Sequence, residues 1–171
     1  MVSGPGTPEV VIRRARKADV SSLAAVMAPE VSLQQLAHRW QGHLEDHREM
    51  LVAALDGKVA GTVSMGGRPE QPGSMRMFAL DVAPAFRRRG VGTALITFVE
   101  DEARSRGLRS VHLEVAVDNV RAFRLYARLG YERQGEATIN RWWRLAGDGR
   151  RERVEEITYT LVKKTRRECR R

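Results

Sequence analysis

The segment from Val82 to Thr93 limits the possible folds more than any other part of the sequence. It passes from a β-type run through Pro84 and three arginines, Arg87-Arg88-Arg89, into Gly90-Val91-Gly92 and the apolar spacing of a helix. The first turn of a helix leaves backbone N–H groups unpaired, and the helix dipole adds partial positive charge there. Glycines let an anion approach that backbone closely. The segment therefore predicts a site for a phosphate-type anion at a strand-to-helix turn.

Other glycine motifs that bind phosphates do not fit this segment. A nucleoside-triphosphate loop needs Gly-Lys-Thr or Gly-Lys-Ser, and a dinucleotide fingerprint needs a third glycine and an acidic partner for the ribose. The sequence has neither pattern here. A second interpretation stays open from this segment alone, namely a basic helix start that uses small residues only for close packing.

Hydrophobic periodicity predicts the element order β-α-α-β-β-β-α-β-α-β-β, which is a mixed α/β sheet with helices on both faces. Asp19, Ser32 with Gln35, and Asp118 are the expected helix starts, and Asp56-Gly57 predicts a tight hairpin. The expected strands are 10–12, 50–55, 58–65, 75–82, 111–117, 131–134 and 154–163, with a loop at 66–73 and a turn at Gly147-Asp148-Gly149.

Length and composition favour one domain. With 171 residues, the chain suits a single domain over 10–163, between a flexible leader at 1–9 and a basic tail at 164–171. No run is apolar enough for a membrane span, and the start does not read as a secretory signal. One cysteine, Cys169, is consistent with a reducing cytoplasm.

The formal net charge is +9, and residues 163–171 hold six basic side chains and one acid, which makes +5 of that total. Such a tail can attract nucleic acid or a ribosome surface. The alternative interpretation is a solvated end without a partner.

A second segment adds a resemblance to a known family. Asn119 is followed by Arg121-Ala122-Phe123-Arg124-Leu125-Tyr126 and then by Leu129-Gly130-Tyr131. This run resembles motif B of the Gcn5-related N-acetyltransferases, and Val82-x-Pro84-x-x-Arg87-x-x-Gly90-x-Gly92 resembles their motif A. Both motifs occur in the family's order, and the flanking elements follow that order over nearly the whole chain apart from the two tails.

The resemblance implies a mixed, mostly antiparallel sheet with a splayed parallel strand pair, and acetyl-CoA as co-substrate. Backbone groups at Leu80 and Val82 would pair with the pantetheine arm as an added strand does. An N–H near Val82 would stabilise the oxyanion. The cofactor-binding residues that it implies are Leu80, Asp81, Val82, Arg87, Arg88, Arg89, Gly90, Val91, Gly92, Thr93, Asn119 and Ala122.

The resemblance also implies direct attack of an amine on the thioester, without an acyl-enzyme. Tyr126 occupies the position of the family's general acid. Leu113-Glu114-Val115 is similar to the bacterial ribosomal-protein alanine N-acetyltransferases, which makes Glu114 the first candidate base; Asp81 is the alternative base. Arg76 stands where histone-acetylating members have a glutamate, which argues against that subtype.

The sequence leaves the acceptor and the oligomeric state open between alternatives. The acceptor is a primary amine on a protein, a polyamine or an aminoglycoside, and the chain is a monomer or a homodimer.

Trp40 is expected in the core, and one of Trp142 and Trp143 at the acceptor entrance. His43 and His47 have metal-compatible spacing but no clear third ligand, so no metal is expected. The alternative function is an inactive binding module with a basic surface for nucleic acid or ribosome.

Overall fold

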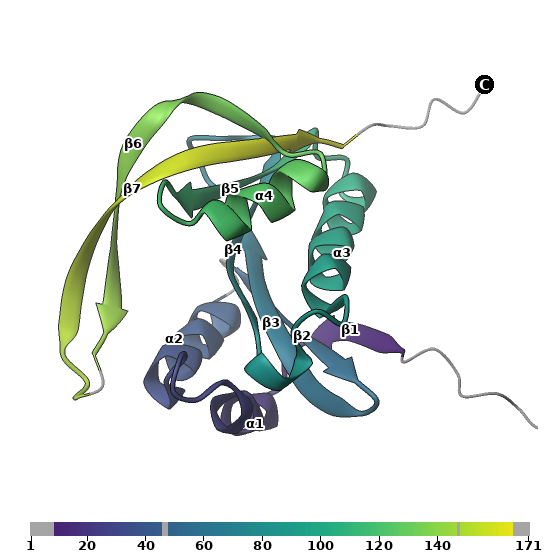
Figure 1. Cartoon of the computed structure of the whole chain (residues 1–171), viewed down its shortest axis with the longest axis vertical. Helices are drawn as coiled ribbons and strands as arrows, with labels where there is room; N and C mark the ends of the chain where they lie inside the picture. Colours follow the sequence, from purple (N-terminus) through teal and green to yellow (C-terminus); the bar gives the residue numbers. More distant parts are fainter. Residues whose placement is uncertain (1–8, 46–47, 147, 166–171) are drawn as a thin grey trace, which may run out of the picture. The chain divides into compact units, whose positions relative to one another are not determined.

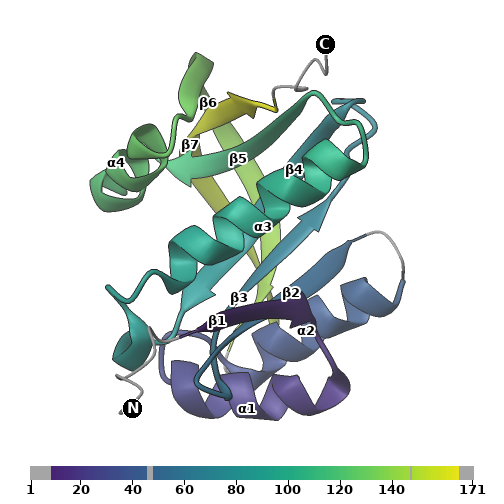
Figure 2. The same ribbon diagram turned by 90° about the vertical axis from the view of Figure 1, so that its right-hand side faces the viewer.

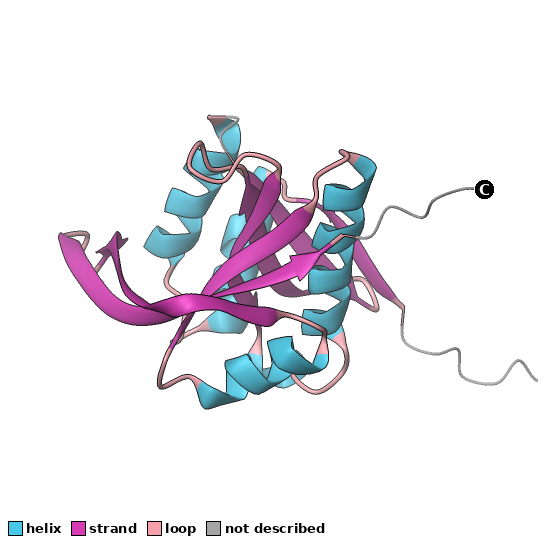
Figure 3. Cartoon of the chain, turned by 90° about the horizontal axis from the view of Figure 1, so that it is seen from above, coloured by secondary structure: helices cyan, strands magenta, loops and turns pink. Residues whose placement is uncertain are grey.

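The structure is a computed structural model that describes residues 9–45, 48–146 and 148–165 (Figure 1). These residues form seven strands, four α-helices and one 3₁₀ turn, η1. Figure 3 distinguishes the helices from the strands by colour. The order along the chain is the predicted one, with η1 added before α3. The elements are β1 (Val10–Arg14), α1 (Lys17–Met27), α2 (Leu33–Leu44), β2 (Glu49–Leu55), β3 (Lys58–Gly66), β4 (Ser74–Val82), η1 (Pro84–Phe86), α3 (Val91–Ser105), β5 (Ser110–Ala116), α4 (Val120–Arg128), β6 (Glu132–Leu145) and β7 (Arg151–Lys164).

The seven strands hydrogen-bond in the order β1-β2-β3-β4-β5-β7-β6. The pairs β1–β2, β5–β7 and β6–β7 are antiparallel, whereas β4 and β5 are parallel. The parallel register runs from Ser74 opposite Ser110 to Arg76 opposite His112. The expected mixed, mostly antiparallel sheet with one parallel pair is therefore confirmed.

The chain divides into two compact units. Unit 1 is Met1–Ser64 with Ala79–Phe98, and unit 2 is Met65–Phe78 with Val99–Arg171. The boundaries fall inside β3, β4 and α3, so each unit takes part of these three elements. The expected single domain over 10–163 stays a prediction.

In unit 1, helices cover both faces of the sheet. Alternate residues of β2 point to opposite faces, yet Met50 to Ala53 are all buried. Met50 and Val52 share a core cluster with α1 and α2, which lie side by side (Figure 2). On β3, a Cβ added to Gly61 would lie 3.1 Å from Val91 Cγ1 and 3.2 Å from Leu95 Cδ1 of α3. The absent side chain thus lets α3 approach β3.

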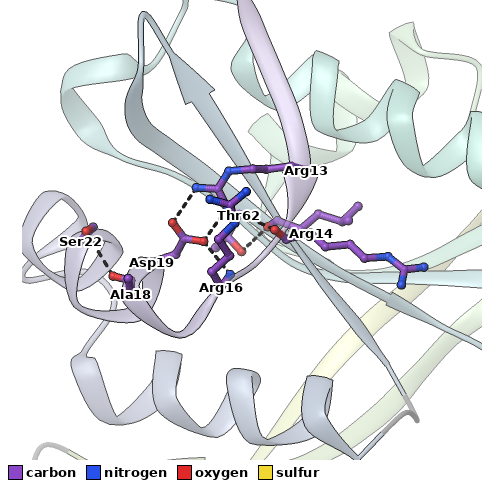
Figure 4. Close-up of polar contacts among 8 residues, drawn as sticks. Arg13, Arg14, Arg16, Ala18, Asp19, Ser22 and Thr62 are labelled. Carbon is purple, nitrogen blue, oxygen red and sulfur yellow. Dashed lines mark hydrogen bonds and ion pairs between the residues drawn. The ribbon is translucent and has the colours of Figure 1, made fainter.

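Helix α1 begins earlier than its sequence indicates. Asp19 was expected to be the N-cap, but Arg16 holds that position and Asp19 is the third helical residue. Its carboxylate accepts the Arg16 backbone N–H at 2.7 Å and two guanidinium bonds from Arg13 at 2.6 and 2.7 Å (Figure 4). A carboxylate at this position satisfies a free helix N–H as well as a capping side chain does. The pKa of Asp19 is lowered, chiefly by the hydrogen bond from Arg13.

Two other local predictions are confirmed. Ser32 Oγ accepts from Gln35 N at 3.1 Å, and Gln35 Oε1 accepts from Ser32 N at 2.9 Å, which is the expected capping box. Asp56 and Gly57 have φ values of 50° and 77° between β2 and β3, as a tight hairpin turn requires.

The last hairpin is longer than expected. A strand was predicted only for 131–134, but β6 runs from Glu132 to Leu145 and pairs with β7, with a register shift between Gln134 and Thr138. The pair Trp142-Trp143, expected outside the strands, lies within β6 with 41% and 54% exposure. This hairpin has cross-strand ion pairs such as Arg141–Glu155 in place of an apolar pattern. Hydrophobic periodicity therefore did not predict the second part of β6.

The ends of the chain lie mostly outside the described residues. Lys164, the first residue of the expected tail, is the last residue of β7, and Thr165 N donates to Arg109 O at 2.9 Å. The rest of that tail stays a prediction. Residues 1–8 and 166–171, with Cys169, are not among the described residues, and neither are His47 and Gly147 of the sequence predictions. None of the described helices is long and apolar enough to cross a membrane.

Candidate active site

In unit 1, the end of β4 turns sharply into α3. Ala83 is buried and its N–H donates to Ala60 O at 2.8 Å, which fixes the strand end. Two left-handed residues, Arg88 with φ 62° and Gly90 with φ 80°, then redirect the chain into the first turn of α3. An arginine rarely takes this conformation, so the turn is specified by its surroundings as well as by its glycine.

The backbone at the start of α3 is open to an approaching group. Among the described residues, and apart from the adjoining backbone, no atom lies within 4 Å of a Cβ built on Gly90, and a Cβ on Gly92 would meet only Val82 Cγ2, at 3.5 Å. The N–H groups of Val91, Gly92 and Thr93 occupy the first helical turn, where no preceding turn supplies acceptors. This combination fits a pyrophosphate, which needs uncrowded donors and partial positive charge.

The three arginines before this helix differ in their side-chain contacts. Arg87 Nε donates to Val82 O at 3.2 Å, and its Nη2 pairs with Glu30. That pairing raises the Arg87 pKa. The guanidinium of Arg89 lies 5.8 Å from the ring centre of Phe86. The Arg87 side chain therefore holds the turn through Val82 O and Glu30, and the contact of this residue with an anion stays a prediction.

Strand β4 carries an irregularity just before Leu80, Asp81 and Val82. Ala79 has φ 52°, a left-handed conformation within the strand. A residue of this kind changes the direction in which the following amides and side chains point, as a β-bulge does. Nothing in the sequence around Ala79 indicates it, because alanine has no preference for positive φ.

Asp81 has an arginine partner within unit 1. Arg39 Nη1, from α2, lies 2.7 Å from Asp81 Oδ2, with 18% of the Arg39 side chain and 34% of the Asp81 side chain exposed. Arg39 could not be recognised from the sequence as this partner, because 42 positions separate it from Asp81.

In unit 2, the carboxylate of Glu114 is held by two arginines. Arg68 Nη1 lies 3.0 Å from Oε1, and Arg76 Nε lies 3.1 Å from Oε2. Arg76 comes from β4, which is parallel to β5, and Arg68 comes from the loop between β3 and β4. Only 12% of the Glu114 side chain is exposed. Both oxygens of the first candidate base are thus in charge-assisted contacts.

His112 lies on the same side of β5 as Glu114 and is fully buried. Its Nδ1 is 2.7 Å from Ser74 Oγ, which also accepts from Ser110 Oγ at 2.9 Å. Burial lowers the pKa of His112 to about 4; Glu114 opposes this shift, and Arg68 and Arg76 favour it. The imidazole is therefore neutral at pH 7. Sequence reasoning assigned no role to this residue.

Helix α4 starts at Asn119, not at Asp118 as expected. Asn119 Oδ1 accepts from Ala122 N at 3.1 Å, so Asn119 is the N-cap. Its side chain thus bonds the start of its own helix. The cofactor contacts of Asn119 and Ala122 stay predictions.

Tyr126 is buried in α4 with 9% exposure. Its ring meets that of Tyr131 edge-on at 5.7 Å between centres, and Tyr131 N donates to Tyr126 O at 3.0 Å. Burial, followed by the charge of Glu100, raises the pKa of Tyr131. The Tyr131 hydroxyl therefore stays protonated at neutral pH. Its backbone N–H holds the end of α4, the helix that carries Tyr126.

Three other predicted side chains take structural positions. Trp40 packs against the unit 1 core, as expected. His43 Nδ1 accepts from Met50 N at 3.2 Å, which uses one of its two ring nitrogens in the fold. The assignment of Trp142 or Trp143 to an acceptor entrance stays a prediction.

The chain combines this sheet with a glycine-lined helix start and two motif segments. Together they are typical of an acyltransferase fold. Residues 17–131 match the model of the Acetyltransferase (GNAT) family, and the chain belongs to this family. Acetyl-CoA is the co-substrate of the family. The similarity to the Gcn5-related N-acetyltransferases expected from the two motifs is confirmed.

Solved structures share the fold over nearly their whole length. The ribosomal-protein-S18-alanine N-acetyltransferase of Escherichia coli is 20% identical, with a TM-score of 0.68 over 95% of this chain and 97% of that one. The yncA protein of Salmonella typhimurium, solved with its cofactor acetyl-CoA, is 19% identical with a TM-score of 0.64, over 94% and 96%. A spermidine/spermine N-acetyltransferase of Vibrio cholerae is 18% identical with a TM-score of 0.66, over 91% and 92%.

Proposed function

We propose that this protein is an acetyl-CoA-dependent N-acetyltransferase that acts on a primary amine. The observation that carries the proposal is the uncrowded backbone at Gly90 and Gly92, at the first turn of α3. Donors arranged in this way suit the pyrophosphate of the co-substrate. Membership of the acetyltransferase family supports the same conclusion.

The cofactor site that we propose uses mainly backbone groups. Leu80 and Val82 offer strand amides and carbonyls to the pantetheine arm, and the N–H groups from Arg87 to Thr93 surround the pyrophosphate. Arg88 and Arg89 add positive charge to this turn, whereas the Arg87 side chain is engaged by Glu30 and Val82 O. Asp81, Asn119 and Ala122 complete the proposed contacts.

In the proposed reaction, the nitrogen lone pair of the acceptor forms a bond to the thioester carbonyl carbon. The carbon–sulfur bond then breaks, and the thiolate takes a proton from Tyr126. The acceptor nitrogen loses a proton to Glu114, directly or through a water. A carboxylate offers about four lone-pair positions, so Glu114 can accept from a water while it keeps both arginines. Asp81, paired with Arg39, is the alternative base.

Thermal unfolding and thiol release together test the proposal. Acetyl-CoA must raise the unfolding midpoint if it binds the native state. A free-thiol assay with acetyl-CoA and a panel of peptides, polyamines and aminoglycosides then detects transfer. An absent midpoint shift at saturating acetyl-CoA would favour the alternative function, a binding module without catalysis.

The general acid is tested by Tyr126→Phe, with Tyr159→Phe as the matched control. The Tyr159 ring contacts Phe123 and Arg133, so removal of its hydroxyl leaves these contacts in place. We expect Tyr126→Phe to lower the rate about 100-fold, since positioned proton transfer contributes about 10²–10⁴-fold. An unchanged rate across pH would remove Tyr126 from the mechanism.

A further inference from the structure

Both carboxylates considered as the base are already matched by arginines of their own unit. Glu114 contacts Arg68 at 3.0 Å and Arg76 at 3.1 Å, and Asp81 contacts Arg39 at 2.7 Å. An acceptor with several ammonium groups is recognised by carboxylates whose charge is unmatched. These two carboxylates do not have that property, and the whole chain carries a net charge of +9.

The positive charge beside Glu114 comes from its two arginines, Arg68 and Arg76. Its buried neighbour His112 is neutral at pH 7, because its pKa is about 4, so it contributes no charge that would alter the balance. Nearby positive charge disfavours the protonated form of an amine. Two guanidiniums beside Glu114 therefore favour a neutral, attacking amine and repel additional ammonium groups of the same molecule.

We propose that the acceptor is an amine with an anionic group a few bonds away, such as the α-amine of an amino acid or of a peptide with an acidic second residue. Arg68 is the specificity-determining residue that contacts this anionic group. Polyamines and aminoglycosides are poor acceptors. This inference rests on the proposed acetyltransferase function, because it assumes that the amine reacts beside Glu114.

Arg68 is better suited to this contact than Arg76. Arg76 lies on β4, and its guanidinium carbon is 4.6 Å from the ring centre of Phe78. Arg68 lies in the loop between β3 and β4, and 35% of its side chain is exposed, against 22% for Arg76. A guanidinium has five N–H donors, so Arg68 can bind a second carboxylate without leaving Glu114.

The test is thiol release with acceptors that differ only in charge. Three peptides share the sequence except for Asp, Ala or Lys at the second position; free alanine, alaninamide and spermidine complete the set. We expect kcat/KM to fall from Asp to Ala to Lys, with about a 10-fold span between Asp and Lys, and spermidine to be the poorest acceptor. Free alanine should exceed alaninamide, and its rank against the Asp peptide tells an amino acid from a protein N-terminus.

Variants at Arg68 connect this preference to the side chain. Arg68→Gln should reduce the span between the Asp and Lys peptides to less than about threefold, and Arg68→Glu should reverse it. Arg104→Gln removes a surface ion pair with Asp101 and should leave the span unchanged. Unfolding midpoints without ligand show whether each variant is folded.

Two outcomes would overturn the inference. One is spermidine or the Lys peptide as the best acceptor, and the other is an unchanged span in Arg68→Gln. In either case acetyl-CoA would still raise the midpoint and thiol would still be released, so the proposed function would stand. Loss of both signals in the unmodified protein would instead overturn the proposed function, and this inference with it.

Discussion

Arg39 of α2 and Asp81 of β4 form an ion pair at 2.7 Å, although 42 positions separate them in the sequence. The contact attaches the second helix to the strand that continues into the glycine-lined turn. It also neutralises the charge of a carboxylate that the sequence offers as a base. Whether Asp81 acts in catalysis or in structure is therefore open to a direct test.

We expect Asp81→Asn to act mainly on stability. The substitution should lower the free energy of unfolding by about 1 kcal/mol, as for a partly exposed ion pair, and change the thiol-release rate less than about threefold. Urea unfolding and the thiol assay give the two values. A double-mutant cycle with Arg39→Met isolates the pair energy. A rate loss of about 100-fold with the fold intact would make Asp81 the base after all.

Gly92→Ala should separate cofactor binding from folding. A Cβ at Gly92 would lie at an ordinary contact distance of 3.5 Å from Val82 Cγ2, and alanine favours the helix by up to about 1 kcal/mol. We therefore expect an unchanged or higher unfolding midpoint without ligand. The rise of the midpoint with acetyl-CoA should become smaller, because the methyl group occupies the approach to the first-turn amides.

The control for this measurement is Ser105→Ala, at the other end of α3, which should keep the full acetyl-CoA effect. Gly90→Ala is less informative, since φ of 80° would strain any alanine there. An acetyl-CoA effect in Gly92→Ala equal to that of the unmodified protein would remove Gly92 from the cofactor site.

Asp19 should make stability depend on pH below about 4. Arg13 and the Arg16 N–H lower its pKa in the folded protein, whereas the unfolded chain keeps a pKa of about 3.9. The stabilisation is therefore complete above the unfolded pKa and disappears as pH falls through the folded one. We expect Asp19→Asn to cost about 2 kcal/mol at pH 7. Urea unfolding from pH 7 to pH 3 should show this difference shrink, and a constant difference would contradict the assignment.

His112 should act in a different pH range. Its folded pKa of about 4 lies below the value of about 6.5 in the unfolded chain, so the unfolded state binds a proton first as pH falls. Stability should then decrease between pH 6.5 and 4 by up to about 1.4 kcal/mol per pH unit. His112→Gln should lose this slope, and Glu114, Arg68 and Arg76 are the charged neighbours that modulate it. An identical slope in the variant would assign it to the other histidines.

Local signals in the sequence predicted most of the fold. The capping box of Ser32 and Gln35 involves residues only three positions apart, and the hairpin turn involves the adjacent pair Asp56-Gly57. Both features could therefore be recognised directly from the sequence. Asp19 and Asp118 were recognised as helix-start residues but placed one to three positions wrong, because several residues near a helix start can satisfy its free N–H groups. Strand β6 was predicted only in its first residues, because the exposed side chains of the remainder are stabilised by cross-strand partners that no local pattern displays.

The candidate site was only partly visible in the sequence. Glycines and arginines near α3 could be read from the motif, but the left-handed Ala79 could not, since the conformation comes from its surroundings. The same holds for the arginines on Glu114. Arg68 and Arg76 lie 46 and 38 positions before it, and only the parallel pairing of β4 with β5 brings Arg76 to that strand.

Glu114 stands in β5 opposite Thr160, inside a register with β7 that runs from Ser110–Lys164 to Ala116–Thr158. Arg68, by contrast, comes from the loop at 67–73, and loops tolerate replacement more readily than paired strands. We therefore expect position 68 to accept substitutions during evolution more readily than position 114. Under the proposed role of Arg68, a library of variants confined to this loop is expected to change the charge preference for the acceptor while β5 and Glu114 stay the same.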